Sequence, residues 1–277
     1  MIYRPELFPE EKVLSYSKYY YMNPDPVHPL FAQIMRKPLD EADVLWPENV
    51  AEMFRPGYQD AMQGYYIFDG GSYSSHYIQL HNVTIDMLDW WFVWFCVPPK
   101  SVPREHGNLR YKIWCPMDHY DHYPEDEWST ERLTNEDMPL RLRRQGIYDV
   151  SIESIDLGKS GIRKELHQHL LYNSELDLPQ ECWDYANACG TVSVFKTDHS
   201  VGLQFYRKTS YGCEAIMRTW RGYTLEAGKM VRVNNFATPT REHVVQDMYH
   251  SYTEISHLAK ILPGVYAEEG NKPVDVY

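Results

Sequence analysis

The sequence has few basic residues for its size. It holds 27 Lys and Arg against 39 Asp and Glu, which gives a formal net charge of −12. Its one tight basic group lies at residues 141–144. Because binding to a polyanion requires many clustered cations, this balance argues against nucleic acid and anionic membranes as partners.

Long apolar runs and paired cysteines are also missing. The longest apolar run, Trp90 to Val97, is far shorter than the roughly twenty residues that cross a bilayer. The N-terminus shows no basic segment followed by an apolar one, as a secretory signal would. The five Cys are scattered without a C-x-x-C pair, which is typical of reduced thiols. We therefore expect a cytoplasmic protein without membrane contact.

Several catalytic motifs are absent as well. The chain contains no G-x-S-x-G, no H-E-x-x-H and no phosphate-binding loop, so serine-hydrolase, zincin and nucleotide-dependent chemistries have no motif support. Aromatic residues, in contrast, are abundant: 23 Tyr, 9 Phe and 8 Trp in 277 residues. A chain of this length can bury a substantial core. We expect Trp90, Trp91 and Trp94 to form part of that core, since large aromatic side chains dominate buried area.

The composition of the chain changes near residue 64. Residues 1–63 are rich in Pro, which favours short helices and irregular segments, and we predict an accessory region there. A regular domain is predicted over 64–277. It begins with a strand pair around Gly70-Gly71 and a helix from Ile85 to Phe95 capped by Thr84. Alternating segments predict further strands, and the fold class is α+β with an antiparallel sheet. These strands are expected over 109–114, 146–157, 192–195, 200–206 and 214–223.

The last predicted helix starts at Thr238-Pro239 and stops at Leu262, before Pro263-Gly264. Residues at three- and four-residue steps form one apolar face: Val245, Met248, Tyr252, Ile255, Ala259 and Leu262. The opposite face carries ionisable residues: His243, Asp247, His250, Glu254 and His257.

This polar face has two interpretations. It is either a solvated helix surface, or a metal site in which His250 and Glu254, at positions i and i+4, provide two ligands. A metal site needs further ligands from elsewhere. His119 and His122 follow one predicted strand, and Glu153 lies on the polar side of another. Each of these residues is common on protein surfaces, so only the combination favours a metal.

Together these segments resemble the phloretin hydrolase and 2,4-diacetylphloroglucinol hydrolase family over about residues 64–265. The resemblance rests on residues 84–94, 110–119 and 250–254. It implies a zinc-dependent hydrolase that cleaves the carbon–carbon bond between an acyl group and a phloroglucinol-type ring. It also implies a helix-grip (START-like) catalytic domain, with a long C-terminal helix against a curved sheet, and a homodimer formed through the N-terminal part.

The resemblance also implies roles for individual residues. The zinc ligands fall on His119, Glu153, His250 and Glu254. The substrate, a small polyphenolic ketone, is expected to contact Tyr111, His122 and Tyr211, and either His122 or Glu153 handles the proton. Cys115 departs from a histidine in some relatives, and the acidic insert at 124–127 bears on the alignment between His119 and Glu153.

Two other functions fit the same residues. A helix-grip protein that only binds an aromatic ligand would carry no metal. A non-haem iron enzyme would use the same His and Glu ligands, since such sets also suit ferrous iron, and its turnover would depend on oxygen.

Overall fold

A computed structural model of the chain describes residues 4–56 and 63–274. Contacts divide the chain into two compact units. Unit 1 comprises Met1–Asp25, Asn82–His169 and Thr253–Tyr277, and unit 2 comprises Pro26–His81 and Leu170–Tyr252. The predicted boundary near residue 64 stays a prediction.

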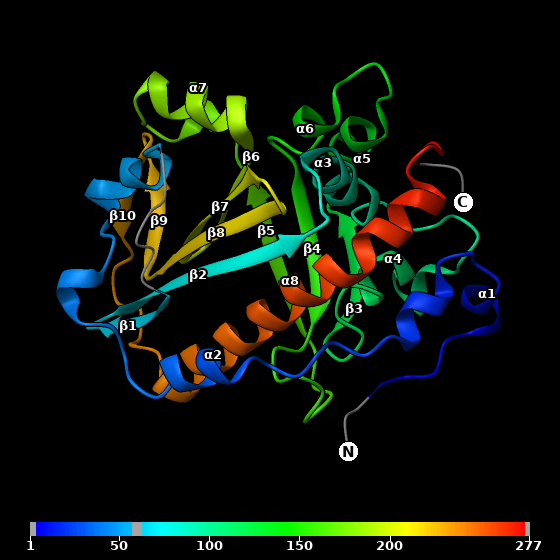
Figure 1. The fold of residues 1–277 in the computed structure, drawn as a ribbon, viewed down its shortest axis with the longest axis horizontal. Coiled ribbons are helices and arrows are strands. Elements are labelled where there is room, and N and C mark those ends of the chain that lie inside the picture. Colours follow the sequence, from blue (N-terminus) through cyan, green and yellow to red (C-terminus); the bar gives the residue numbers. More distant parts are fainter. Residues whose placement is uncertain (1–3, 57–62, 275–277) are drawn as a thin grey trace. The chain divides into compact units, whose positions relative to one another are not determined.

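Unit 2 is built on an antiparallel sheet in the order β1-β2-β8-β7-β6. Its strands lie over Gly64–Phe68, Gly71–His81, Gly212–Arg221, Ser200–Thr209 and Gly190–Thr197. As Figure 1 shows, the cyan β2 runs beside the yellow β8, although about 130 residues separate them in sequence. A smaller pair joins β9 (Tyr223–Glu226) to β10 (Lys229–Arg232).

Short turns account for the neighbouring strand pairs of unit 2. Phe68 pairs with Gly71, so Asp69-Gly70 forms a two-residue hairpin loop. Gly70, the second residue of this loop, has φ +66°, a left-handed conformation that glycine adopts without steric cost. The strand pair predicted here is confirmed. The predicted strands over 192–195, 200–206 and 214–223 also correspond to β6, β7 and β8, the last ending at Arg221.

The core of unit 2 covers one face of this sheet. It is formed by β6–β8, by η3 (Pro47–Phe54) and by α7 (Gln180–Cys189), with Phe54, Trp183, Leu203, Phe205 and Trp220 among its buried residues. A second cluster packs α2 (Pro29–Ile34) against the first part of α8, through Phe31, Met35, Tyr65, Val244 and Met248. The other short helices of this unit are η2 (Glu41–Asp43) and η5 (Asn173–Glu175).

Unit 1 contains the antiparallel strands β3 (His119–Pro124), β4 (Tyr148–Glu153) and β5 (Lys164–Leu170), in that order. Around them lie α3 (Ile85–Trp94), α4 (Leu109–Lys112), α5 (Glu127–Thr134) and α6 (Leu140–Arg143). The N-terminal segment adds α1 (Pro9–Lys12) and η1 (Ser17–Tyr21), and η4 covers Arg104–His106. The short helices predicted within residues 1–63 are confirmed where the structure describes them.

Helix α3 forms as predicted. Thr84 caps it, because the Thr84 hydroxyl accepts a hydrogen bond from the backbone N–H of Met87 at 3.2 Å. Pro98-Pro99 follow its end. Trp90, Trp91 and Trp94 are all buried, which places them in the core of unit 1.

The strand predicted over 109–114 is wrong, because this segment forms the helical turn α4. The side chain of Asn108 caps the turn by accepting a hydrogen bond from Arg110 N at 3.0 Å. The alternation of charged and apolar residues does not mark two faces, since all six residues are buried. Arg110 donates to the carbonyl oxygens of Trp94, Val97 and Val274, and Lys112 pairs with Glu11. Charged side chains buried inside the core therefore imitate the alternation of a strand.

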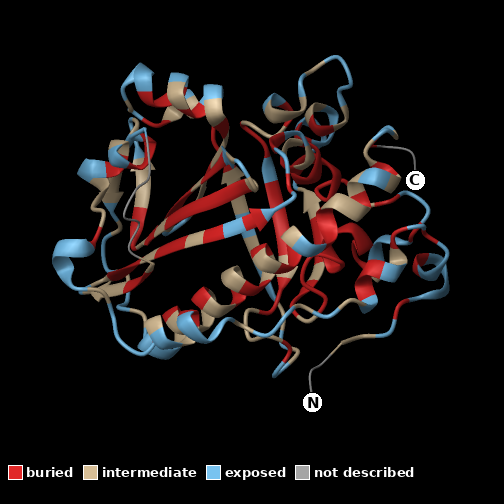
Figure 2. Cartoon of the chain, viewed as in Figure 1, coloured by how far each residue is buried: buried red, intermediate tan, exposed pale blue. Residues whose placement is uncertain are grey.

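The last helix, α8 (Arg241–Glu269), differs from its prediction at both ends. Thr240, not Thr238, caps it, accepting from His243 N at 3.2 Å. The helix also continues through Pro263. A proline inside a helix costs about 3 kcal/mol through its missing N–H and its steric clash. Because Leu262 and Val265 are fully buried on either side, we infer that their packing offsets this cost. Figure 2 shows buried residues recurring along the second half of α8, between partly buried ones.

Candidate metal centre

Strand pairing brings His119 and Glu153 together in unit 1. The two residues lie directly opposite each other on β3 and β4. A bulge between His119 and Asp121 then shifts the register, so that His122 lies opposite Ser151. Residues three apart on a regular strand face opposite ways, whereas an extra residue in the ladder restores a common face. The bulge therefore lets His119 and His122 share the side of the sheet that carries Glu153 and Ser151.

His119 is held in one orientation. Its Nδ1 lies 3.2 Å from the backbone oxygen of Tyr111, and its ring stacks on the Tyr111 ring with centroids 3.8 Å apart and an interplanar angle of 3°. Nδ1 can donate a proton to that carbonyl, which leaves Nε2 as the ring atom available to a metal ion. A backbone carbonyl behind the ligating imidazole is the usual arrangement in zinc sites.

Two carboxylates face this nitrogen. His119 Nε2 lies 3.3 Å from Glu153 Oε2 and 3.3 Å from Glu254 Oε2, and all three side chains are largely buried. Ligand atoms bound about 2.0–2.1 Å from a tetrahedral ion lie about 3.3–3.4 Å apart. The spacing and the donor set therefore suit zinc. Two buried carboxylates next to an imidazole also require a compensating positive charge.

His250 lies on α8, one turn before Glu254. The division between the units falls between Tyr252 and Thr253, but α8 is one continuous helix across it. His250 and Glu254 each offer a ligand atom within 4.8 Å of the other. The spacing of four residues thus places two of the predicted ligands side by side, as expected.

The solvated interpretation of the polar face of α8 is wrong for its middle part. His250 and His257 are buried, with His257 only 1% exposed. Within the described residues, neither ring nitrogen of His257 has a hydrogen-bond partner. Burial, with smaller contributions from Lys260 and Arg4, lowers the pKa of His257 to about 4. His257 is therefore a neutral core histidine.

This burial predicts an acid-sensitive fold. The folded-state pKa of His257 lies below the unfolded value of about 6.5, so its contribution to stability is complete above pH 6.5 and is lost as the pH falls to about 4. The loss is on the order of 3 kcal/mol. Urea unfolding of His257→Leu should show a shallower decline over this range than the wild type. An equally steep decline in the variant would contradict the assignment.

Tyr111 supports the same site from α4. Its hydroxyl donates a hydrogen bond to Glu153. Burial, followed by the charges of Glu153 and Glu254, raises the pKa of Tyr111 well above its usual value. The phenol therefore stays protonated and acts as a donor.

Tyr111→Phe should lower the affinity of this site for a metal ion, because it removes the hydrogen bond that orients Glu153, one of the proposed ligands. Loss of such a supporting contact typically lowers metal affinity about 10–100-fold. Competition with a chromogenic zinc chelator measures the change. Unaltered affinity would mean that the phenol serves another purpose.

His122 is also buried in unit 1. Its Nδ1 is 2.9 Å from Ser151 Oγ, and its Nε2 is 3.3 Å from Asp149 Oδ2. Burial lowers the pKa of His122, but Cys96 and Asp149 outweigh that effect and raise it to about 10. Both ring nitrogens therefore face protein groups. The predicted contact of His122 with substrate stays a prediction.

Tyr211 belongs to unit 2, in the loop Ser210-Tyr211 that joins β7 to β8. Its hydroxyl donates to Glu214 Oε2 at 3.2 Å, and its ring lies 4.8 Å from that of His81. Glu214 also pairs with Arg207 and accepts from Tyr77. The predicted substrate role of Tyr211 remains untested.

Sequence reasoning missed Asp149 and Cys96 as partners of His122. Asp149, Ser151 and Glu153 alternate along β4, and that pattern indicates a polar face. The face is buried, however, and not solvated. Burial of a polar face is the signal that could have identified these residues, and it depends on tertiary packing.

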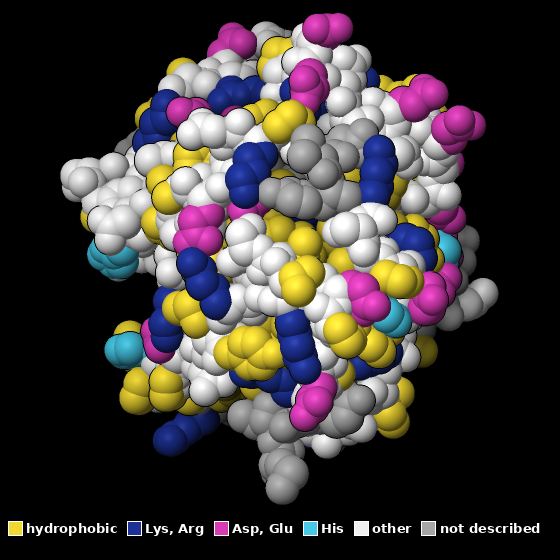
Figure 3. All heavy atoms as spheres, turned by 90° about the vertical axis from the view of Figure 1, so that its right-hand side faces the viewer, with side chains coloured by type: hydrophobic (Ala, Val, Ile, Leu, Met, Phe, Trp, Pro, Cys, Tyr) yellow, Lys and Arg dark blue, Asp and Glu magenta, His cyan; other side chains and the backbone are white. Residues whose placement is uncertain are grey.

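Charges on the surface agree with the composition. On the face drawn in Figure 3, Lys and Arg side chains are interspersed with Asp and Glu, and no broad basic area is seen there. Among the described helices, none is long and apolar enough to cross a membrane.

Comparisons with known proteins decide the family. The sequence model of the DAPG hydrolase PhiG domain matches residues 45–267. The chain belongs to this family. It is also 27% identical over 269 residues to a phloretin hydrolase from Eubacterium ramulus, which covers 94% of this chain and 92% of that protein. The predicted family resemblance is therefore confirmed.

Two solved structures also match the chain at low identity. A protein from Nitrosomonas europaea matches 69% of this chain and 94% of its own, with a TM-score of 0.35 and 12% identity. A protein of unknown function from Staphylococcus aureus matches 73% of this chain and 98% of its own, with a TM-score of 0.33 and 7% identity. These scores are too low to support the helix-grip classification. What the structure bears out is a mixed fold with a large antiparallel sheet and a long C-terminal helix.

Proposed function

We propose that this protein is a zinc-dependent hydrolase that cleaves the carbon–carbon bond between an acyl group and a phloroglucinol-type ring. The observation that carries the proposal is the cluster of His119, Glu153 and Glu254, with His250 one turn away on α8, in a chain of the DAPG hydrolase family. The relative named phloretin hydrolase supports a polyphenolic ketone as substrate. The expected homodimer and cytoplasmic location remain part of the proposal.

The reaction adds the elements of water across one bond. The hydroxyl group joins the acyl carbon, giving a carboxylic acid, and the ring carbon takes a proton, giving the free phloroglucinol. When bound, zinc acts as a Lewis acid toward the ketone and makes water nucleophilic at neutral pH. His119, Glu153, His250 and Glu254 would hold the ion.

The side chains of this site would handle the remaining steps. The protonated phenol of Tyr111 can donate to a ring oxygen as negative charge returns to the ring, which stabilises an enolate-like state. Its existing hydrogen bond to Glu153 connects that donor to a carboxylate able to carry a proton. Both ring nitrogens of His122 contact protein groups, Ser151 and Asp149. The hydrogen bond between Tyr111 and Glu153 therefore favours Glu153 as the group that moves the proton.

Product formation tests the proposal. Zinc-loaded protein should release phloroglucinol from phloretin or from mono- or diacetylphloroglucinol, which chromatography detects directly. His250→Ala should abolish release and lose the zinc ion of this site, whereas His243→Ala should retain both, because His243 lies partly in solvent two turns earlier on α8. Full activity of a metal-free His250→Ala protein would contradict the proposal.

A further inference from the structure

A second group of metal-ligating side chains lies in unit 1, outside the set formed by His119, Glu153 and Glu254. Cys96 follows α3, His122 is on β3 and Asp149 is on β4. A ligand atom from each lies within 4.8 Å of those from the other two. All three residues are buried, with 0% exposure for Cys96 and Asp149 and 3% for His122.

Within the described part of the chain, three polar atoms of this group lack a hydrogen bond: His122 Nε2 and the two carboxylate oxygens of Asp149. Among the residues that the structure describes, none donates a hydrogen bond to either carboxylate oxygen of Asp149, and none forms a hydrogen bond with His122 Nε2. The approach of Nε2 to Asp149 Oδ2, at 3.3 Å, is longer than the 2.7–2.9 Å typical of a charge-assisted hydrogen bond. A buried carboxylate without hydrogen bonds is strongly unfavourable unless a cation compensates it.

His122 is oriented so that its Nε2 faces the carboxylate of Asp149. Its Nδ1 lies 2.9 Å from Ser151 Oγ, and Asn108 Nδ2 donates to its backbone oxygen at 2.8 Å, so the ring is fixed from behind. Nε2 is directed toward Asp149, and without a metal it carries a proton, because Cys96 and Asp149 raise the pKa of His122 to about 10. A metal ion that displaces this proton would meet an imidazole nitrogen and a carboxylate oxygen that face each other.

We propose that Cys96, His122 and Asp149 bind a second metal ion, of the zinc class. Sulfur, imidazole nitrogen and carboxylate oxygen are all zinc ligands, whereas magnesium and calcium avoid thiolates. The 3.3 Å separation of Nε2 and Oδ2 again matches the edge of a tetrahedron around a zinc ion. Binding removes the thiol proton that Cys96 now donates to the backbone oxygen of Phe92.

This second site would fix the strands that carry the first. It joins the end of α3 to β3 and β4, three residues after His119 and four residues before Glu153. A metal there would hold the bulged β3 in the register that places His119 opposite Glu153. The inference does not rest on the proposed reaction, because it concerns binding alone.

Cobalt substitution distinguishes the two sites. A cobalt ion bound to a thiolate gives an intense near-ultraviolet charge-transfer band, and the first site contains no sulfur among its proposed ligands. We expect the full-length protein to take up two cobalt ions per chain and to show this band. Cys96→Ser and Asp149→Asn should each bind one ion, and Cys96→Ser should lose the band.

Two controls make the result decisive. Glu254→Gln disables the first site and should retain the band with one ion, and Cys115→Ser tests the nearest other thiol in the sequence and should retain both ions and the band. A wild-type protein that binds one cobalt without the band would overturn the proposal, and so would a band that survives Cys96→Ser. The first of these outcomes would assign the compensating charge to a proton on His122. The wild-type spectrum decides even if a variant does not fold.

Discussion

Glu254→Gln is expected to lower kcat/KM for phloroglucinol release about a thousand-fold or more. The amide keeps the shape of the side chain but cannot supply the negative charge that a zinc site uses. A Lewis acid contributes several kcal/mol to such a reaction, and each 1.4 kcal/mol corresponds to a tenfold change in rate. Steady-state assays with phloretin and elemental analysis of the same sample measure activity and zinc together.

A matched control lies on the same helix. Glu242 is exposed in the first turn of α8, so Glu242→Gln should retain both zinc and activity. The metal assignment predicts that Glu254→Gln loses activity together with the zinc ion of the first site. A Glu254→Gln enzyme that lacks this ion but keeps wild-type turnover would remove Glu254 from the reaction.

Lys112→Met is expected to lower the free energy of unfolding by about 3–5 kcal/mol. Lys112 Nζ lies 2.7 Å from Glu11 Oε1, and both side chains are buried. Removing one partner of a buried ion pair leaves the other charge uncompensated. Urea unfolding followed by circular dichroism gives the change.

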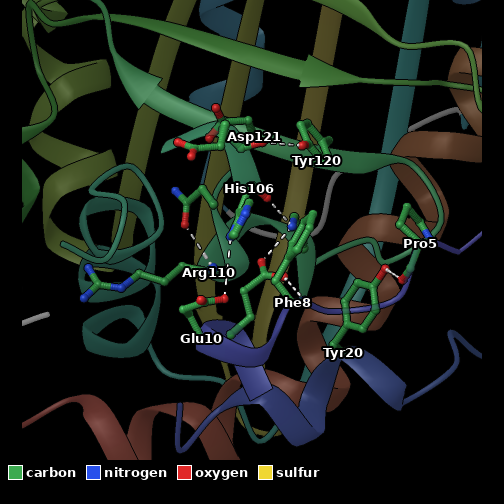
Figure 4. A network of polar contacts seen from close by, with 12 residues as sticks. Pro5, Phe8, Glu10, Tyr20, His106, Arg110, Tyr120 and Asp121 are labelled. Atoms are coloured by element: carbon green, nitrogen blue, oxygen red, sulfur yellow. Dashed lines mark hydrogen bonds and ion pairs between the residues drawn. The ribbon is translucent and has the colours of Figure 1, made fainter. Parts of the chain in front are cut away.

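The effect should spread through the contacts of the N-terminal segment with α4 and η4. Lys112 also donates to the backbone oxygen of His106, and the His106 ring stacks on Phe8 with centroids 3.6 Å apart (Figure 4). Glu10 approaches the same ring at 3.9 Å. The ion pair between Lys112 and Glu11 therefore holds α1 beside α4, the turn that carries Tyr111.

Two further variants separate this effect from a general loss of charge. The double variant Glu11→Leu with Lys112→Met should recover most of the stability, because replacing both buried charges by apolar groups is often neutral. Lys18→Met removes a pair of similar length, 2.6 Å, that is partly exposed to solvent, and it should cost less than about 1 kcal/mol. Equal losses for Lys18→Met and Lys112→Met would contradict the role of burial.

The fold is predictable from sequence where local signals suffice. Loops such as Asp69-Gly70 determine hairpins through turn geometry, and Thr84 with Pro98 determines the position of α3. The α4 turn is not predictable in this way. Charged residues inside it are paired by Glu11 and by carbonyl groups distant in sequence, so their alternation carries no information about solvent.

The candidate site shows the same limit. His250 and Glu254 are recognisable because four residues make one helical turn. The approach of His119 to Glu153 depends instead on a bulge and on strand register, which no local pattern specifies. Cys96 joins His122 and Asp149 only through packing, and for this reason it carried no signal in the sequence.

Removal and restoration of the metal ion tests whether phloroglucinol release depends on zinc. Full-length protein is dialysed against a chelator, assayed for phloroglucinol release from phloretin and the acetylphloroglucinols, and then assayed again after addition of zinc. The chelated protein should be inactive, and added zinc should restore release. Undiminished release by protein shown to contain no metal would contradict this dependence on zinc.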